Sequence, residues 1–154
     1  MPKIEPGNSP GTYILLLRCK QRQRIRIGKL GEFPFLPGWY LYVGSAFGPG
    51  GVAARCNHHC RISVRPHWHI DYLRSALALR EIWFTHDPVH REHHWARCLA
   101  SGMGLSSPVH RFGASDCDCG SHLFFSAVKS DCEHFQALQY ADLGRQAAVY
   151  CKFV

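Results

Sequence analysis

The most constraining stretch of this chain is an aromatic strand that runs into a glycine-rich turn and then a helix. Residues 38–44 read Gly-Trp-Tyr-Leu-Tyr-Val-Gly, so Tyr40 and Tyr42 share one strand face, because side chains alternate along a strand. The glycines and the proline of residues 48–51 supply the break that a strand-to-helix turn requires. The segment therefore predicts a strand followed closely by a helix.

A four-residue period predicts that helix. Val52, Cys56 and Cys60 recur along one stripe, and Arg55 and His59 share an adjoining face. The strand and the helix together bring tyrosine hydroxyls near a guanidinium and an imidazole. Such a set of groups can hold a phosphate, because guanidinium N–H groups match phosphate oxygens.

The length and composition are those of one ordinary globular domain. A chain of 154 residues with 46% hydrophobic and 19% charged residues can bury a core, which excludes the disordered class. Its formal net charge of +7 favours an acidic partner, and nucleic acid is the first such partner to consider.

The N-terminus and the cysteines bear on the cellular compartment. Residues 1–10 are polar and contain prolines, so we expect a flexible leader and no signal peptide. No stretch approaches the length of a membrane span, so no membrane association is expected. The eight cysteines are irregularly spaced, and a chain of this size does not need disulfides. We therefore expect reduced thiols and a cytoplasmic location.

Hydrophobic periodicity, glycines and prolines predict the remaining elements. We expect strands over residues 11–19, 24–30, 38–44, 80–85 and 122–128. We expect helices over residues 51–62, 66–79, 87–101 and 131–140, with Asp87 capping the third. The strand at 11–19 is apolar on both faces, so other elements should cover both. The result is one domain over residues 11–140 and a tail, 141–154, with weak signals.

A row of basic side chains marks the second predicted strand. Arg22, Arg24 and Arg26 alternate with less polar residues, so one strand edge presents three arginines to solvent. Such a row either keeps an exposed strand edge soluble or contacts phosphates. Both interpretations stay open at the level of the sequence.

One glutamate interrupts the apolar pattern of the third predicted helix. Trp95, Ala96 and Leu99 form the apolar face, and Glu92 lies one turn earlier in the same stripe. A buried carboxylate needs a cation, a partner or a wet cleft, because its uncompensated charge is costly. Glu92 is therefore a ligand of a hard divalent ion such as magnesium, a partner of an arginine, or exposed by a rotation of the helix.

The second predicted helix has a buried stripe and a group of polar residues. Ile70, Leu73 and Leu77 form the stripe. His67 and Asp71 share one helix face, whereas His69 lies almost opposite, so the three cannot bind one ion. We expect His69 to be a packed histidine or to contact a cleft.

Soft metal ligands lie close together near residue 120. Cys117, Cys119 and His122, completed by a cysteine or histidine of the first helix, would form a tetrahedral zinc site. The Cys-x-Cys spacing is tighter than in the usual structural zinc knuckle, so a turn packed against the sheet is the alternative. Cys56 and Cys98 are expected to be small core residues and not nucleophiles.

Several of these residues carry a resemblance to a known family. Gly11-Thr12-Tyr13 and Tyr42-Val43-Gly44 resemble the paired signature of the GIY-YIG nuclease superfamily. Arg55 and Glu92 fall where that superfamily has its arginine and its metal-binding glutamate. The chain is most similar to one branch, a small bacterial and archaeal domain of unknown function that is sometimes fused to endonuclease III-type DNA glycosylases. Its motifs resemble residues 27–31, 42–46 with 50–51, 67–73, and 115–119 with 121–124.

This resemblance, over about residues 11–126, implies a small α+β (α/β) fold. The fold has a three-stranded antiparallel sheet flanked by helices, here with an extra C-terminal strand and helix. The implied activity is hydrolysis of a DNA phosphodiester with Mg²⁺ or Mn²⁺ as cofactor. Glu92 would hold the ion, Arg55 would steady charge on the phosphoryl oxygens, and Tyr13 would orient or deprotonate the attacking water. Tyr42 and His59 would hydrogen-bond the phosphate or the water.

The basicity of tyrosine bears on the role expected of Tyr13. Tyrosine is a poor base at its usual pKa of about 10, so Tyr13 only orients the water unless a nearby cation lowers its pKa.

The chain departs from the resemblance in two places. An arginine-bearing strand separates Tyr13 from Tyr42, whereas the founding members have a short segment there. Glu92 is followed by His93 where the branch more often has a carboxylate, so Glu92 is the sole acidic candidate on this helix.

The leading hypothesis is a metal-dependent DNA endonuclease in repair or processing of DNA, with DNA and a DNA glycosylase or other repair protein as partners. Two alternatives come from other classes: a non-catalytic nucleic-acid-binding adaptor of the same fold, and a zinc-stabilised interaction module. The residues expected to contact DNA are Arg22, Arg24, Arg26, Lys29 and Arg61.

Overall fold

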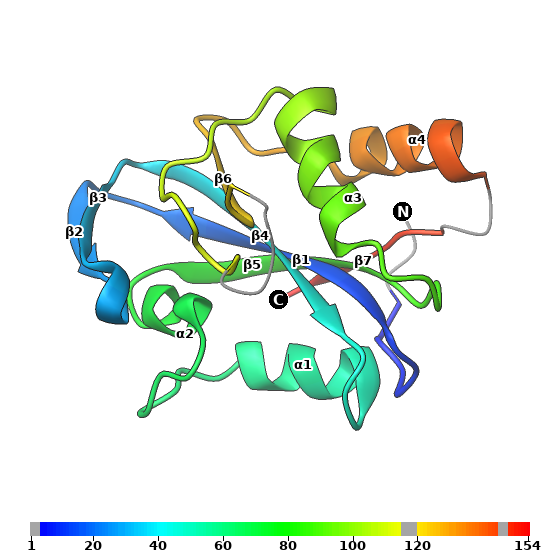
Figure 1. Ribbon diagram of the computed structural model, residues 1–154, viewed down its shortest axis with the longest axis horizontal. Helices are drawn as coiled ribbons and strands as arrows, with labels where there is room; N and C mark the ends of the chain where they lie inside the picture. Colours follow the sequence, from blue (N-terminus) through cyan, green and yellow to red (C-terminus); the bar gives the residue numbers. More distant parts are fainter. Residues whose placement is uncertain (1–3, 115–119, 145–147) are drawn as a thin grey trace.

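The computed structural model describes residues 4–114, 120–144 and 148–154. Within these residues, five strands form one antiparallel sheet in the order β6-β4-β1-β5-β7, and β2 pairs with β3 in a separate ribbon (Figure 1). The strands are β1 Gly11–Cys19, β2 Gln23–Arg26, β3 Glu32–Phe35, β4 Gly38–Ala46, β5 Ala78–Thr85, β6 Leu123–Ser126 and β7 Tyr150–Phe153. The helices are α1 Gly51–His59, α2 His69–Arg74, α3 Glu92–Arg97 and α4 Cys132–Leu143, with short turns of helix at η1 Gly28–Leu30 and η2 Cys98–Gly102.

Strand β1 lies at the centre of the sheet and is buried on both faces. Tyr13, Leu15 and Leu17 pack in one cluster with residues of α1 and α2, while Ile14 and Leu16 pack in a second cluster with residues of α3 and α4. Figure 1 shows the two helix pairs on opposite faces of the sheet. The alternation of apolar residues predicted two covered faces, and the prediction is confirmed.

The predicted α+β class and antiparallel sheet are confirmed, and the sheet is wider than expected. The strands predicted over residues 11–19, 38–44 and 80–85 correspond to β1, β4 and β5, which form the centre of this sheet. The predicted strand at 122–128 corresponds to β6 and pairs with β4, while β7, in the tail with weak signals, pairs with β5. A four-residue strand carries too little periodicity to be recognised in a sequence.

The single strand predicted over residues 24–30 is wrong beyond Arg26. The chain folds back there, because the Ile27 amide donates to the Gly31 carbonyl and the Leu30 amide donates to the Ile27 carbonyl. Gly31 has a φ of 111°, a conformation that residues with a Cβ rarely adopt. The result is the η1 turn and the β2–β3 ribbon, which packs through Ile25 and Ile27 into the core cluster shared with α2.

The second predicted helix is shorter than expected. The Asp71 carboxylate accepts hydrogen bonds from the amides of His67 and Trp68, so the helix begins only at His69. The Arg74 guanidinium donates to the carbonyls of His59 and Leu77, and β5 begins at Ala78. The predicted stripe of Ile70, Leu73 and Leu77 is nevertheless buried.

The third predicted helix begins later than expected, and the first ends earlier. Asp87 does not cap α3, because its carboxylate accepts from the Val89 amide and the Arg91 side chain and holds a turn before the helix. The apolar face of Trp95, Ala96 and Leu99 is buried as predicted. In α1, Val52 and Cys56 are buried, but Cys60 lies beyond the last helical residue and is exposed.

The N-terminal segment contacts the start of α1. The amides of Val52 and Ala53 donate to the carbonyls of Ser9 and Gly7, which provides partners for amide groups that the first turn of a helix leaves unbonded. In the part of the chain that the structure describes, no helix has the length and apolar character that crossing a membrane requires.

Replacing Leu15 by alanine tests the central position of β1. Leu15 is fully buried, so its truncation should lower the free energy of unfolding by about 2–5 kcal/mol through reduced burial and a residual cavity. Val64→Ala is the control: its side chain is 94% exposed, and the change should stay within about 0.5 kcal/mol. Urea unfolding of both variants measures the difference, and an equal cost would contradict the assigned core.

Candidate active site

A cleft of about 340 Å³ brings together residues that are far apart in the sequence. Its walls come from β1, β4, α1, the start of α2, the start of α3 and the segments near residues 113 and 122. The lining residues are Tyr13, Tyr42, Ser45, Arg55, His67, Trp68, His69, Glu92, His93, Gly113 and His122. Tyr13, Tyr42, Arg55 and Glu92, four of the five predicted catalytic residues, are thus neighbours in one cleft.

The strand register places the two tyrosines side by side. Tyr13 on β1 pairs with Gly44 on β4, and Leu15 pairs with Tyr42, so both tyrosine rings project from the same face of adjacent strands. A Cβ atom at position 44 would lie 2.5 Å from the Tyr13 hydroxyl oxygen, so only glycine leaves space for this ring. The Tyr42 ring is held edge-on against Phe112 at 5.8 Å.

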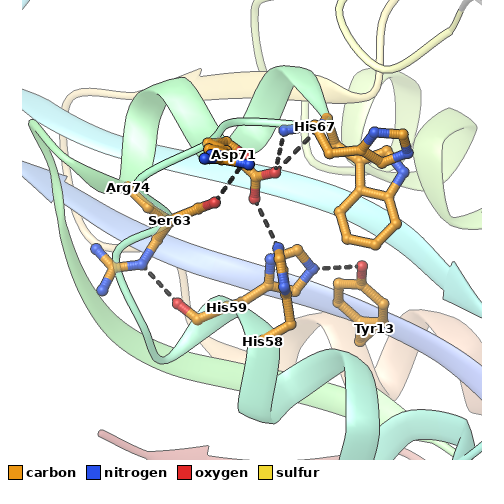
Figure 2. Close-up of polar contacts among 9 residues, drawn as sticks. Tyr13, His58, His59, Ser63, His67, Asp71 and Arg74 are labelled. Carbon is orange, nitrogen blue, oxygen red and sulfur yellow. Dashed lines mark hydrogen bonds and ion pairs between the residues drawn. The ribbon is translucent and has the colours of Figure 1, made fainter.

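His59 lies behind Tyr13 and not in the wall of the cleft. Its Nε2 is 2.7 Å from the Tyr13 hydroxyl oxygen, and its side chain is almost fully buried (Figure 2). Burial, reinforced by the neighbouring His58, lowers the pKa of His59 to about 3, so its imidazole is neutral at pH 7. A neutral imidazole with its proton on Nδ1 accepts the Tyr13 hydroxyl at Nε2.

Burial also governs the two tyrosine hydroxyls. It raises the pKa of Tyr13 well above its usual value, and nearby Tyr42 raises it further, while Arg55 lowers it by less. It likewise raises the pKa of Tyr42, and Glu92 adds to that effect. Both phenols therefore keep their protons at neutral pH. The neighbouring Arg55 guanidinium therefore does not by itself lower the pKa of Tyr13 below its usual value.

The Arg55 guanidinium lies over an indole ring. The carbon at the centre of its guanidinium is 4.3 Å from the centroid of the Trp68 ring. The Trp68 ring is in turn edge-on to His58 at 4.9 Å. A cation–π contact of this kind attracts the guanidinium to the face of the ring and helps to position it.

The buried Asp71 carboxylate fixes the segment that carries Trp68 through hydrogen bonds. Asp71 accepts His58 Nε2 on one oxygen at 2.9 Å and the amides of His67 and Trp68 on the other (Figure 2). Burial opposes the ionised form of Asp71, but these amide and imidazole hydrogen bonds outweigh it, so its pKa lies below the usual value. The charged Asp71 therefore fixes the start of α2 and, through it, the ring beneath Arg55.

Glu92 opens into the cleft beside two histidines. Its side chain is 23% exposed, and its Oε1 lies 3.5 Å from His122 Nδ1 and 3.8 Å from His93 Nε2. Among the described residues, its ion-pair contacts are with these imidazoles and not with an arginine. Burial lowers the pKa of His122 although Glu92 raises it, so this imidazole is neutral at pH 7.

The remaining predicted site residues lie elsewhere or outside the described residues. His122 is close to Glu92, whereas Cys117 and Cys119 of the expected zinc site fall in 115–119, which the structure does not describe. The expected DNA contacts are exposed and do not line the cleft; they are Arg22, Arg24, Arg26, Lys29 and Arg61. Arg24 lies 3.8 Å from Glu32 across the β2–β3 ribbon, as an exposed pair of little energetic weight.

Sequence reasoning did not assign Trp68 or His93 to the site. His69 was expected to be packed or to contact a cleft, and it does both: it lines the cleft, and its Nδ1 accepts the Gly113 amide at 2.9 Å. The signal that pointed toward Trp68 was its place among histidines just before a helix start. His93 carried none, because residues adjacent in a helix project about 100° apart, so its place next to Glu92 in the sequence does not predict a shared site.

The comparison with known proteins assigns the chain to a family. The family model described as Domain of unknown function DUF123 matches residues 12–144. The chain belongs to this family. No curated protein and no solved structure matches it. The DUF123 match includes every residue that lines the cleft, so the cleft is part of the DUF123 domain. The predicted similarity to a domain of unknown function is confirmed, and the match does not extend to the GIY-YIG superfamily.

The buried neutral state of His59 predicts a pH dependence of stability. In the unfolded chain a histidine has a pKa of about 6.5, so between pH 6.5 and pH 3 the unfolded state binds a proton that the folded state does not. The contribution of neutral His59 to the free energy of unfolding is therefore fully present above pH 6.5, and it decreases as the pH falls below that value. From pH 7 to pH 5 the loss should be about 2 kcal/mol.

His59→Gln should remove this part of the pH dependence, because glutamine does not titrate while its amide oxygen can still accept the Tyr13 hydroxyl. Urea unfolding at a series of pH values measures the slope. Tyr13→Phe is the matched control, since it removes the hydrogen bond but leaves His59 buried, and it should keep the wild-type slope. An unchanged slope in His59→Gln would contradict a buried neutral imidazole.

Proposed function

We propose that this DUF123 domain is a member of the GIY-YIG nuclease superfamily and a metal-dependent DNA endonuclease. The observation that carries the proposal is the convergence of Tyr13, Tyr42, Arg55 and Glu92 in one cleft. These residues come from two strands and two helices, and they are the ones that the resemblance assigns to phosphodiester hydrolysis. A shared cleft supports a common role, because chemistry requires the acting groups within reach of one reacting atom.

The donor set at Glu92 fits a divalent ion. A partly exposed carboxylate lies beside two imidazoles, and the ion pairs of the described residues give it no guanidinium that would neutralise its charge. Glu92 would hold Mg²⁺ or Mn²⁺ there. When bound, such an ion supplies Lewis-acid stabilisation of charge on a phosphate oxygen.

Arg55 is suited to bind the phosphate itself. Within the described chain no carboxylate lies in ion-pair contact with it, and its face is occupied by Trp68. Its N–H edges can therefore donate to phosphate oxygens in the bidentate manner that suits arginine. The positive charge would also offset charge that develops on the phosphoryl oxygens during hydrolysis.

The tyrosines would position the reactants. With the His59 proton on Nδ1, the Tyr13 hydroxyl donates a hydrogen bond to His59 Nε2, and its oxygen would still accept a hydrogen bond from a water molecule in the cleft. Tyr42 lines the cleft and keeps its proton, so it would donate to a phosphate oxygen. His59 thus acts through Tyr13, as a residue that orients the phenol.

Glu92→Gln should abolish metal-dependent cleavage while the protein still binds DNA. The loss should be at least about 100-fold, because a Lewis-acid ion contributes several kcal/mol to the stability of the transition state. The assay uses labelled plasmid, nicked, flap and junction DNAs with magnesium, manganese or a chelator. Glu133→Gln, an exposed glutamate of α4, is the control and should cut like wild type.

Other outcomes of this assay separate the alternatives. If wild type binds these DNAs but cuts none of them with either ion, the non-catalytic adaptor replaces the endonuclease. If Glu92→Gln cuts as fast as wild type, the assignment of Glu92 is wrong.

The exposed arginines of the β2–β3 ribbon should contribute to DNA affinity by neutralising phosphates. In Arg24→Ala/Arg26→Ala, the slope of log K against log salt concentration should become shallower by about 0.9 for each phosphate that the protein no longer neutralises. Arg80→Ala/Arg97→Ala, which removes two exposed arginines not assigned to DNA, is the matched control and should keep the wild-type slope. Equal slopes in both double variants would leave the arginine row with a role in solubility alone.

A further inference from the structure

Two groups of side chains in the described chain have three metal-ligating atoms within 4.8 Å of one another. One group is His58, His59 and Asp71, and the other is Glu92, His93 and His122. Proximity alone does not make a metal site, because such atoms are often partners in hydrogen bonds with each other. The two groups differ in the lengths of the contacts within each group and in whether all of their residues line the cleft.

The first group is a hydrogen-bonded scaffold. One Asp71 oxygen accepts His58 Nε2, the other accepts two backbone amides, and His59 Nε2 contacts the Tyr13 hydroxyl. An ion placed there would have to break the contacts that begin α2 and hold Tyr13. This group therefore has no ligand set to offer.

The second group has a spacing close to that of a metal centre. Two ligands bound at about 2.1 Å to the same tetrahedral or octahedral ion lie roughly 3.0–3.4 Å apart. Glu92 Oε1 lies 3.5 Å from His122 Nδ1 and 3.8 Å from His93 Nε2. Contacts of this length are too long for good hydrogen bonds, so a shift of a few tenths of an ångström would turn them into coordination distances.

One histidine of this group is fixed and the other can adjust. The His122 side chain is 1% exposed, and its backbone is held on both sides: its amide donates to Phe112 and its carbonyl accepts from Val43. The His93 side chain is 52% exposed on the first turn of α3. The exposed His93 side chain can therefore move toward Glu92 and His122 to bind an ion, and the sheet need not move.

The group also faces the space where a phosphate would lie. All three residues line the cleft that contains Tyr13 and Arg55, so positions around an ion not taken by the protein would open into it. Three protein ligands with open positions are the pattern of a catalytic metal centre, whereas structural sites are closed by four.

We propose that Glu92, His93 and His122 form a two-histidine, one-carboxylate site that selects a first-row transition-metal ion over magnesium. The two imidazole nitrogens decide the selectivity, because Mg²⁺ prefers oxygen ligands and retained waters, whereas imidazole suits zinc, copper, iron and nickel. The inference rests on the proposed function in that it names the ion of the same cleft. Binding of the ion is measurable without any DNA.

The test is a titration of metal-free wild-type protein with Co²⁺, followed by visible absorption and calorimetry. One Co²⁺ should bind per chain with the spectrum of nitrogen and oxygen ligands, and about a 100-fold excess of Mg²⁺ should leave it bound. His93→Ala should weaken Co²⁺ binding by at least about tenfold, and Glu92→Gln and His122→Asn should do the same. His94→Ala is the matched control on the same helix, since His94 contacts Asp142 and not Glu92, and it should bind like wild type.

Three results would overturn the proposal. The first is Co²⁺ binding by His93→Ala that is as tight as binding by wild type. His93 is exposed, so its replacement by alanine should not unfold the protein. The second is displacement of Co²⁺ by an equal concentration of Mg²⁺. The third is a thiolate-to-cobalt charge-transfer band, which would put the ion on cysteines.

The outcomes also separate this proposal from that of the endonuclease. Co²⁺ binding that depends on His93, in a protein that cuts no DNA, would support the metal site and remove the nuclease. Cleavage that depends on Glu92 and Mg²⁺ but not on His93 would support the nuclease and remove this site.

Discussion

The register between β1 and β4 is the constraint on which the cleft depends. It puts the Tyr13 ring over Gly44 and brings Tyr42 to the same face two residues away. A shift of one residue would turn every side chain of β1 to the opposite face. Such a shift is prevented because both faces of β1 are buried in separate clusters beneath different helices. The same apolar packing that stabilises the sheet therefore also places the polar groups of the cleft.

Burial then determines the protonation states of the groups that this register places near the cleft. Burial keeps His59 neutral and Tyr13 protonated, so the two share a hydrogen bond between uncharged groups and no charge lies beneath the cleft at that point. Asp71 is the exception, and it remains ionised because two amides and an imidazole satisfy its oxygens. Charge that can act on a ligand is thereby concentrated on Arg55 and Glu92, both of which line the cleft.

These two charges are supported in different ways. Arg55 rests on Trp68, which belongs to the segment that Asp71 holds, so among the described residues the guanidinium is positioned by packing and not by a carboxylate. In the described part of the chain, the ion-pair neighbours of Glu92 are imidazoles and not a guanidinium, and imidazoles can share a bound cation with it. A phosphate group between a bound cation and Arg55 would meet positive charge on both sides. Under the proposed function, the cleft would therefore bind an anionic ligand, in keeping with the net charge of the chain.

The sequence alone determined the class of fold, the covered faces of β1, the apolar faces of α2 and α3, and the motif residues Tyr13, Tyr42, Arg55 and Glu92. The fold class and the apolar faces follow from local periodicity, which each element expresses whatever it packs against. The roles expected of the four motif residues follow from the resemblance to the GIY-YIG superfamily and not from periodicity. It did not determine where α2 and α3 begin, because the Asp71 and Asp87 carboxylates bind specific amides that only the folded chain brings to them. Nor could it join Trp68 to Arg55, or His93 and His122 to Glu92. Trp68 is distant from Arg55 in the sequence, as is His122 from Glu92, and His93 and Glu92 point apart on an ideal helix. Only the strand register and the packing of the connecting segments bring these side chains together.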